Sequence, residues 1–248
     1  KEKKKKNPLQ GLNPKQKEVV INGDGYCLVL GGTGTGKTTT LTRRIAHLIN
    51  NGVPYEAILG VTFTNRASRE MKERVKVLIH RRWRDIWLGT FHHICERILR
   101  KHIRRMGFSR EFAIYDWRVQ ISVMKSVLSS NVEEAKEVLH GISKAKTQLI
   151  SPEKLMEKVK SKWERKVAEG YGLYQKRLRE NNALDFDDLI FHTVKLFKEN
   201  EDILDFYAKR FQYVLVDEYQ DINLAEYKLL GLLSYHHNNL FVTGDDDQ

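Results

Sequence analysis

The sequence predicts an α/β fold in which a parallel sheet with crossover helices is interrupted by a long helical insertion. Residues 26–105 alternate between short apolar runs and amphipathic helical stretches. Residues 108–210 then show helical periodicity and no convincing strand. Apolar runs return at residues 211–216 and 240–243, on either side of one further helix. Strand–helix alternation indicates parallel strands, because parallel neighbours must be joined by a crossover connection.

The first half of the sheet is assigned from apolar runs that lead into turns or helices. Residues 26–30 are predicted to form a buried strand, residues 57–62 a second strand and residues 86–88 a very short third strand. The helices that follow these strands are predicted over residues 38–50, 68–80 and 91–105. Met71, Val75, Leu78 and Ile79 share one face of the second helix, which indicates the face that packs on the sheet.

The insertion contains recognisable helix starts. Ser151-Pro152-Glu153 supplies a cap, a proline in the first turn and an acid near the positive helix end. Asp185 can cap another helix, with Asp187 and Asp188 in its first turn. These acids could instead bind a metal, but capping is the preferred interpretation. The predicted organisation is a disordered basic lead over 1–10, an α/β domain over 11–107 and 211–248, and a helical subdomain over 108–210.

Composition indicates a soluble globular chain with room for a core, since 41% of its 248 residues are hydrophobic. No apolar run approaches the roughly 20 residues that a membrane helix needs, so no membrane association is expected. Cys27 and Cys95 lie far apart and form no metal-ligand spacing, which predicts reduced thiols and a cytoplasmic protein. The four tryptophans (Trp83, Trp87, Trp117 and Trp163) are expected in the core.

The net charge of +11 is concentrated in one stretch of the chain. Residues 66–105 hold thirteen Lys or Arg against four Asp or Glu, and residues 1–6 hold five Lys against one Glu. Concentrated basic charge is the electrostatic footprint of a polyanion partner. A solvated helix face with a basic tail is the equally simple alternative, and charge alone leaves both open.

A phosphate-binding loop is the strongest motif. Gly31-Gly-Thr-Gly-Thr-Gly-Lys37-Thr38 has glycine, four residues, then Gly-Lys-Thr, and it lies between an apolar strand and a helix. Glycines let the backbone turn so that N–H groups face one phosphate, and the next helix presents its positive end to the anion. Lys37 is predicted to reach the β and γ phosphates and the Thr38 hydroxyl to ligate Mg²⁺. The predicted nucleotide-binding residues of the loop are Gly32, Thr33, Gly34, Thr35, Gly36, Lys37, Thr38 and Thr39.

The second half of the predicted site is the apolar run 214–216 followed by two carboxylates. Asp217 can supply the oxygen ligand that Mg²⁺ needs, and Glu218 can orient and deprotonate the attacking water. An acidic pair at a strand end is common, so this signal is strong only together with the phosphate loop. The intervening length exceeds one βαβ unit, and the helical insertion accounts for it.

Other segments carry weaker signals. Gln248 follows a strand with a polar end and could sense the γ-phosphate, although a surface turn is the alternative. Gln16 precedes the first strand, and its amide could pair with adenine. Residues 61–66 and 89–92 each place an aromatic beside hydroxyl, amide or basic groups at a strand end, which suits single-stranded nucleic acid. Core aromatics plus helix caps are the preferred interpretation of either segment taken alone.

Taken in series, these motifs resemble the UvrD/Rep-type superfamily 1 DNA helicases. The phosphate loop is generic, whereas the other segments in this order and spacing are specific to that family. Arg66 stands where many relatives have lysine. The resemblance is carried by residues 12–16 (LNPKQ), 31–38 (GGTGTGKT), 61–67 (VTFTNRA), 89–92 (GTFH), 142–146 (ISKAK), 184–189 (LDFDDL), 216–221 (VDEYQD) and 244–248 (GDDDQ).

The resemblance implies a RecA-like P-loop NTPase domain with an all-α inserted subdomain, working in an ATP-dependent 3′-to-5′ helicase or translocase on single-stranded DNA. It implies that Gln16 recognises adenine, that Lys37, Asp217 and Glu218 are catalytic, and that Gln248 reads the γ-phosphate. It implies Thr38 and Asp217 as magnesium ligands. The implied single-strand track comprises Phe63, Thr64, Asn65, Arg66, Thr90 and His92.

Members of that family continue past the point that corresponds to Gln248 into a second RecA-like domain that supplies catalytic arginines. The isolated chain is therefore expected to be a monomer that binds Mg-ATP and single-stranded DNA, hydrolyses ATP slowly and does not unwind DNA. Two alternatives stay open. One is a truncated, non-enzymatic nucleotide- or DNA-binding module that works with a partner. The other is a P-loop motor on protein substrates, against which the DNA-track segments argue.

Overall fold

The computed structural model describes residues 7–32, 34–79 and 82–245, and the chain divides into two compact units. The sheet unit comprises residues 1–94, 200–222 and 230–248, and the helical unit comprises residues 95–199 and 223–229. Helices α4 (Phe91–His102) and α11 (Leu224–Ser234) have residues in both units. The domain boundaries expected from the sequence, after residues 107 and 210, differ from these limits and stay a prediction.

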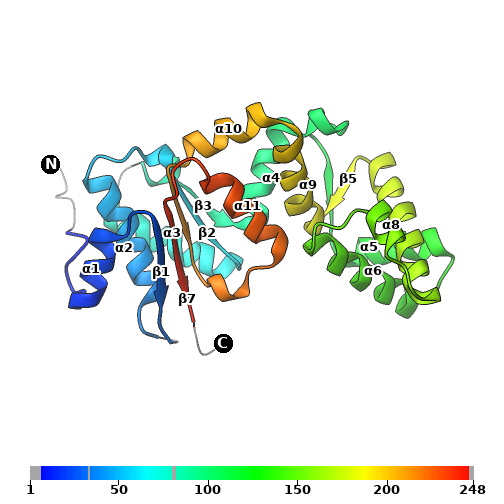
Figure 1. Cartoon of the computed structure of the whole chain (residues 1–248), viewed down its shortest axis with the longest axis horizontal. Helices are drawn as coiled ribbons and strands as arrows, with labels where there is room; N and C mark the ends of the chain where they lie inside the picture. Colours follow the sequence, from blue (N-terminus) through cyan, green and yellow to red (C-terminus); the bar gives the residue numbers. More distant parts are fainter. Residues whose placement is uncertain (1–6, 33, 80–81, 246–248) are drawn as a thin grey trace. The chain divides into compact units, whose positions relative to one another are not determined.

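The sheet unit is built on five parallel strands in the order β1-β7-β6-β2-β3 (Figure 1). They are β1 (Tyr26–Leu30), β2 (Ile58–Thr62), β3 (Trp87–Thr90), β6 (Tyr213–Val216) and β7 (Leu240–Gly244). The predicted parallel sheet is confirmed. Strands β6 and β7 follow the helical insertion in the sequence, yet they lie between β1 and β2 in the sheet. Because all five strands run the same way, their carboxyl ends meet at one edge.

Helices α1 (Pro14–Asn22), α2 (Lys37–Asn50), α3 (Asn65–Ile79) and α10 (Glu201–Arg210) complete most of the sheet unit. Leu41 and Ile45 of α2 and Met71 and Val75 of α3 are fully buried in one core cluster with residues of the sheet. Burying each such side chain stabilises the folded state by about 1.5–3 kcal/mol relative to leaving it exposed to water. Helix α3 begins three residues earlier than predicted, because the Thr64 hydroxyl accepts the backbone N–H of Ala67 and so caps an earlier turn.

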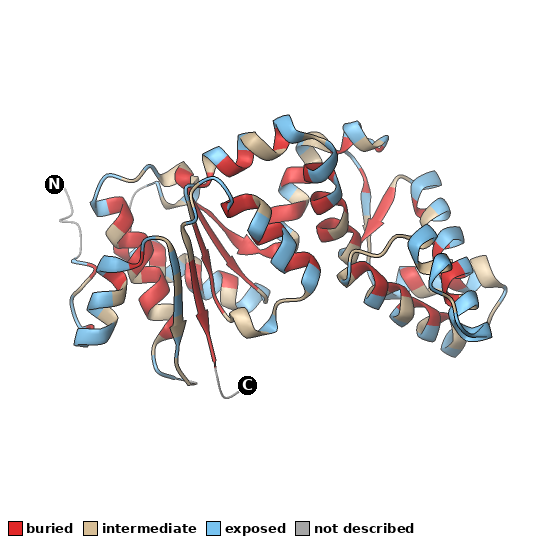
Figure 2. Cartoon of the chain, in the orientation of Figure 1, coloured by how far each residue is buried: buried red, intermediate tan, exposed pale blue. Residues whose placement is uncertain are grey.

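Burial differs between the strands, as Figure 2 shows. All five residues of β2 are buried, whereas β1 alternates between exposed and half-buried residues. Tyr26, Leu28 and Leu30 are 69%, 58% and 55% exposed. The prediction of a strand here is confirmed, but the prediction that it is buried is wrong for these three residues. Strand β1 is the edge of the sheet, and only its other face packs against the core.

The helical unit contains α5 (Trp117–Leu128), α6 (Val132–Thr147), α7 (Pro152–Glu157), α8 (Lys162–Glu180) and α9 (Phe186–Glu199). The predicted cap of α7 is confirmed, since the Ser151 hydroxyl accepts the N–H of Lys154. The expectation of an all-α insertion needs one correction. Strands β4 (Ala113–Tyr115) and β5 (Ala183–Asp185) pair in parallel within this unit. Three-residue strands are too short to show an alternating pattern in the sequence.

The tryptophans are not uniformly core residues. Trp87 is buried, with its ring centroid 5.1 Å from that of Phe211. Trp117 and Trp163 are 39% and 43% exposed, so the core prediction is wrong for these two. Each lies in the first turn of its helix, where part of the side chain faces solvent.

The two cysteines are free thiols. Burial raises the pKa of the Cys95 thiol to about 12, so this side chain stays protonated at neutral pH. Over the ranges that the structure describes, no helix combines the length and the apolar character needed to cross a bilayer.

Candidate functional site

The loop between β1 and α2 has the backbone geometry of an anion cradle. Gly34 and Gly36 adopt φ angles of +80° and +90°, in the left-handed region that favours glycine. Helix α2 begins at Lys37, directly after Gly36, so its unpaired N–H groups and its positive end face the loop. Thr33, one of the predicted nucleotide-binding residues, lies outside the described residues. Gly34 and Gly36 therefore lie where the turn favours glycine, and their role in nucleotide binding stays a prediction.

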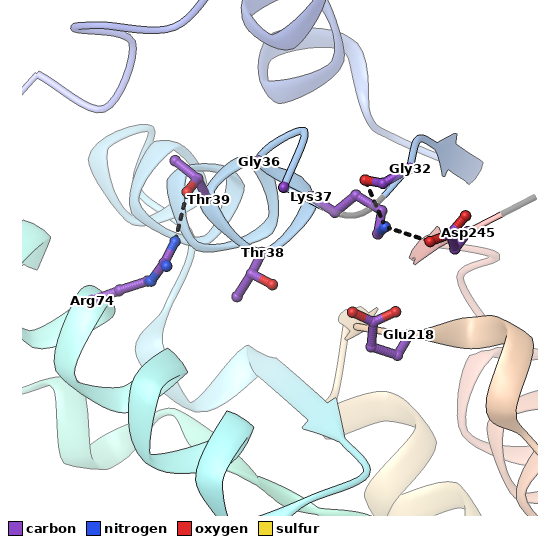
Figure 3. Close-up of a pocket in the computed structure, with 9 residues that line it drawn as sticks. Gly32, Gly36, Lys37, Thr38, Thr39, Arg74, Glu218 and Asp245 are labelled. Carbon is purple, nitrogen blue, oxygen red and sulfur yellow. Dashed lines mark hydrogen bonds and ion pairs between the residues drawn. The ribbon is translucent and has the colours of Figure 1, made fainter. Parts of the chain in front are cut away.

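Lys37 is nearly buried and points into the loop (Figure 3). Its ammonium group donates hydrogen bonds to the carbonyl oxygens of Gly31 (2.5 Å) and Gly32 (3.1 Å). It also lies 3.6 Å from a carboxylate oxygen of Asp245, which follows β7. These contacts satisfy a buried cation with neutral acceptors and one carboxylate.

The phosphate loop meets β6 through one short hydrogen bond. The Thr38 hydroxyl donates to Oδ2 of Asp217 over 2.6 Å, although the two residues are far apart in sequence. Asp217 is buried, and its Oδ1 accepts a hydrogen bond from the Thr243 hydroxyl of β7 over 2.5 Å. The start of α2 and strand β7 therefore both contact the carboxylate that follows β6. The geometry brings together the two residues that the sequence predicts as magnesium ligands, and their roles stay a prediction.

A pocket of about 270 Å³ lies over the loop. The side chains of Glu218 and Asp245 enter it from the ends of β6 and β7, and Figure 3 shows the Glu218 carboxylate pointing toward the loop. The pocket lining is mostly polar and carries two cations, Lys37 and Arg74. Its residues are Gly32, Gly34, Gly36, Lys37, Thr38, Thr39, Arg74, Glu218 and Asp245.

Arg74 is a pocket residue that the motif analysis did not identify. It lies on α3 and donates from Nη1 to the hydroxyl of Thr39 (2.6 Å) and from Nη2 to Glu70 (2.5 Å). Its only signal in the sequence is its membership of the basic stretch, which does not distinguish it from its neighbours. A second pocket of about 370 Å³, between α2 and α3, shares Thr39 and Arg74 with the first.

Gln16 lies beside the loop rather than free in solvent. Its Oε1 accepts the N–H of Asn13, which completes a capping box at the start of α1. Its Nε2 donates to the carbonyl of Thr35 in the phosphate loop over 3.1 Å. The side chain therefore ties α1 to the loop, and adenine recognition by Gln16 stays a prediction. Gln248, the predicted γ-phosphate sensor, lies outside the described residues.

The predicted DNA-track segments follow β2 and β3, which are neighbours in the sheet with Thr62 opposite Thr90. Thr64 and Thr90 use their hydroxyls as helix caps, accepting the N–H groups of Ala67 and His93. The capping alternative therefore accounts for these two hydroxyls. Asn65 and Arg66 are exposed, and Phe63 and His92 are half-buried. The ring centroid of Phe63 lies 5.4 Å from that of the buried Phe91. The track itself stays a prediction.

In the helical unit, the segments 142–146 and 184–189 meet around one buried cation. Lys146 Nζ lies 2.6 Å from Asp185 Oδ2 and 2.8 Å from Asp188 Oδ1, and all three residues are almost fully buried. Asp185 also caps α9, because its Oδ1 accepts the N–H of Asp188. The preferred capping interpretation is therefore confirmed. No group of three or more metal-ligating side chains is found among the described residues.

Burial and charge set the protonation of this cluster. Burial alone disfavours the charged form of Lys146, but Asp185 and Asp188 outweigh it and hold the lysine pKa above its usual range. Burial and the nearby Asp188 raise the pKa of Asp185, since two carboxylates share one ammonium. Burial lowers the pKa of His192 to about 3, so its ring is neutral beside Asp188.

The chain matches a known protein family over most of its length. Residues 12–248 match the family described as the UvrD/REP helicase N-terminal domain. The chain is 45% identical over 247 residues to the ATP-dependent DNA helicase PcrA of Bacillus subtilis. It is 42% identical to the proteins of the same name from Staphylococcus aureus (strain Mu50) and Staphylococcus epidermidis.

These alignments cover 97% of the chain but only 33–34% of the relatives. The chain thus spans about a third of the length of the curated relatives it matches. Phosphate loop, acidic strand end and parallel sheet all agree with the family match, and the predicted RecA-like P-loop class is confirmed. The chain therefore belongs to the UvrD/REP helicase N-terminal domain family.

Proposed function

We propose that the chain is the ATP-binding part of an ATP-dependent 3′-to-5′ DNA helicase or translocase that acts on single-stranded DNA. The observation that carries the proposal is the 2.6 Å contact between Thr38 and Asp217, which joins the phosphate loop to the acidic strand end. The names of the relatives, all ATP-dependent DNA helicases, support it. A cytoplasmic location and a monomeric chain remain predictions from the sequence.

The triphosphate is proposed to lie along the loop, against the N–H groups that precede α2. Lys37 would exchange its carbonyl acceptors and Asp245 for phosphate oxygens. Arg74 supplies a second positive charge at the rim of the same pocket. The adjoining pocket between α2 and α3, which shares Thr39 and Arg74, offers room for the nucleoside on that side. Gln16 is the proposed adenine contact, beside Thr35.

The donors at Thr38 and Asp217 fit a magnesium ion. A hydroxyl and a carboxylate are hard oxygen ligands of the kind Mg²⁺ takes in P-loop NTPases, where phosphates and waters complete its coordination. Bound there, the ion would neutralise charge on the β and γ phosphates. The Thr243 hydroxyl donates a hydrogen bond to the other oxygen of Asp217 and so helps to orient that carboxylate.

Glu218 is the proposed general base. Its carboxylate would take a proton from a water whose oxygen bonds to the γ-phosphorus, while the bond from that phosphorus to the β–γ bridging oxygen breaks. The products are ADP and inorganic phosphate. General-base residues contribute typically about 10²- to 10⁴-fold to rate. We propose that a second RecA-like domain, Gln248 and the single-strand track couple this step to movement on DNA.

Equilibrium binding of a fluorescent ATP analogue in the presence of Mg²⁺ tests the proposal. The wild-type chain should bind, and Lys37→Ala should lose most of the affinity while keeping its circular dichroism spectrum, because Lys37 faces the loop and not the core. Lys17→Ala removes an exposed lysine of α1 and serves as the matched control. Equal nucleotide affinity in all three proteins would contradict the assignment of the phosphate site.

A further inference from the structure

The amide of Gln220 bridges the ends of two neighbouring strands. Gln220 lies in the short 3₁₀ turn Tyr219–Asp221 that follows Glu218. Its Nε2 donates to Oε2 of Glu218 over 2.7 Å. Its Oε1 accepts the backbone N–H of Asp245 over 3.1 Å. One side chain therefore contacts both the carboxylate after β6 and the backbone after β7.

The chemistry of the three groups fixes the direction of both hydrogen bonds. A backbone N–H such as that of Asp245 can only donate, so it must meet the oxygen of the amide. The amide nitrogen then faces Glu218, and an ionised carboxylate can only accept. The assignment of oxygen and nitrogen is thus determined by the partners rather than chosen freely. Neither bond can be kept if the amide turns over.

The turn that carries Gln220 has an unusual backbone conformation. Glu218 has a φ of +56°, a left-handed conformation that is uncommon for a residue with a side chain and costs on the order of 1 kcal/mol or more. Gln220 Oε1 also lies close to Gly244, since a Cβ placed on that glycine would be 3.4 Å away, an ordinary van der Waals contact. The turn therefore places the Gln220 amide between Glu218 and the backbone at the end of β7.

We propose that Gln220 is a positioning residue for Glu218: it holds one carboxylate oxygen and links that carboxylate to the backbone of Asp245, directly after β7. The inference rests on the proposed function, in which Glu218 activates water. With Oε2 held by Gln220, Glu218 lines the nucleotide pocket in a fixed orientation. The side chain of Asp245 lies 3.6 Å from Lys37, so the same residue contacts the proposed phosphate-binding lysine and, through Gln220, the proposed general base.

Two substitutions separate the two halves of the bridge. Gln220→Glu keeps an oxygen acceptor for Asp245 but replaces the donor to Glu218 with a like charge. Gln220→Ala removes both contacts. Gln212→Glu, at an exposed position just before β6, makes the same chemical change away from the pocket and is the control. Circular dichroism and binding of the fluorescent ATP analogue establish that each variant is folded and binds nucleotide.

Hydrolysis is measured in single turnovers, with the chain in excess over trace γ-labelled ATP, so that slow rates are resolved. Both Gln220 variants should hydrolyse about 10- to 100-fold more slowly than wild type, a smaller loss than removal of the base itself. Nucleotide affinity should change less than about threefold, as expected for an interaction that acts on the chemical step. Gln212→Glu should match wild type in both measurements.

Backbone hydrogen exchange gives a readout that does not depend on turnover. The Asp245 amide should stay protected in Gln220→Glu and exchange faster in Gln220→Ala. Equal hydrolysis rates in wild type and Gln220→Glu, including equal rates at the uncatalysed background, would overturn the inference. So would an Asp245 amide that exchanges equally fast in wild type and Gln220→Ala. A wild-type chain that binds no ATP would instead refute the proposed function, so the two failures are distinguishable.

Discussion

Replacing Lys146 with methionine is expected to destabilise the helical unit strongly. The ammonium group of Lys146 is the shared partner of Asp185 and Asp188, at 2.6 Å and 2.8 Å, and none of the three side chains is more than 4% exposed. Methionine fills similar space but carries no charge. The substitution therefore leaves two carboxylates in a site with little access to water, which is the costly way to break a buried ion pair.

The magnitude follows from burial and from the second role of the acids. Removing one partner of a buried pair typically costs about 3–5 kcal/mol, and solvent screening does not reduce this where exposure is near zero. The acids cannot rearrange freely, because Asp185 Oδ1 and Asp188 Oδ2 each accept a backbone N–H at the start of α9. Tyr174 still donates to Asp185 Oδ2, so part of the carboxylate charge remains solvated by a hydroxyl. We expect a loss of about 3–4 kcal/mol in the free energy of unfolding of this unit.

The assay is native-state hydrogen exchange of backbone amides in α6, α8 and α9, with chemical denaturation followed by circular dichroism. Exchange reports on the helical unit by itself, which matters because a chain with two compact units need not unfold in one step. Lys144→Met, at an exposed position of the same helix, is the matched control and should change stability by less than about 0.5 kcal/mol.

The way in which the stability deficit of Lys146→Met changes with pH distinguishes the loss of charge compensation from a loss of packing. The folded-state pKa of Asp185 is raised by burial and by Asp188, and Lys146 opposes that rise. Without Lys146, the folded protein should bind a proton more readily than the unfolded chain, so folding gains stability as pH falls. The deficit of Lys146→Met should therefore shrink as the solution is acidified from neutrality. A variant as stable as Lys144→Met at pH 7, or a deficit that grows on mild acidification, would refute the reasoning.

Three further predictions concern the nucleotide and DNA sites. Gln16→Ala should reduce the ratio of ATP affinity to GTP affinity in competition binding. An unchanged ratio would contradict the proposal that Gln16 recognises adenine. Thr38→Val should weaken ATP binding roughly tenfold in Mg²⁺ but little in EDTA, since it deletes the hydroxyl beside Asp217; equal losses in both buffers would argue against a metal ligand. Arg66→Ala should weaken single-stranded DNA binding and reduce the salt slope by about one, whereas Arg118→Ala, exposed in the helical unit, should not.

Local chemistry let the sequence predict the elements around the site. The phosphate loop, the strand that precedes it and the acidic end of β6 were all predicted from short-range patterns. Glycines at 34 and 36 follow from turn rules that act over a few residues, and the helix predicted from residue 38 begins one residue earlier, at Lys37. The strand β1 was also predicted, but its exposed face was not, because strand propensity does not say which neighbours cover a strand.

Contacts between distant residues were decided by the tertiary structure. Arg74 enters the pocket only because α3 packs beside α2, and Gln220 meets Asp245 only because β6 and β7 are neighbours in register. The short strands β4 and β5 are also far apart in the sequence, and they pair only with each other. Likewise, the sequence marked 142–146 and 184–189 as family segments without indicating that they meet at Lys146.

The sequence by itself determined the chemical groups of this protein: a phosphate loop, two strand-end carboxylates and a concentrated basic stretch. The sequence suffices for these groups because turns, caps and helical periodicity depend on residues only a few positions apart in the chain. The order of the strands and the packing of α2 on α3 decided which of those groups share a pocket. Such long-range pairing depends on which surfaces exclude water together, and that is a property of the folded chain as a whole.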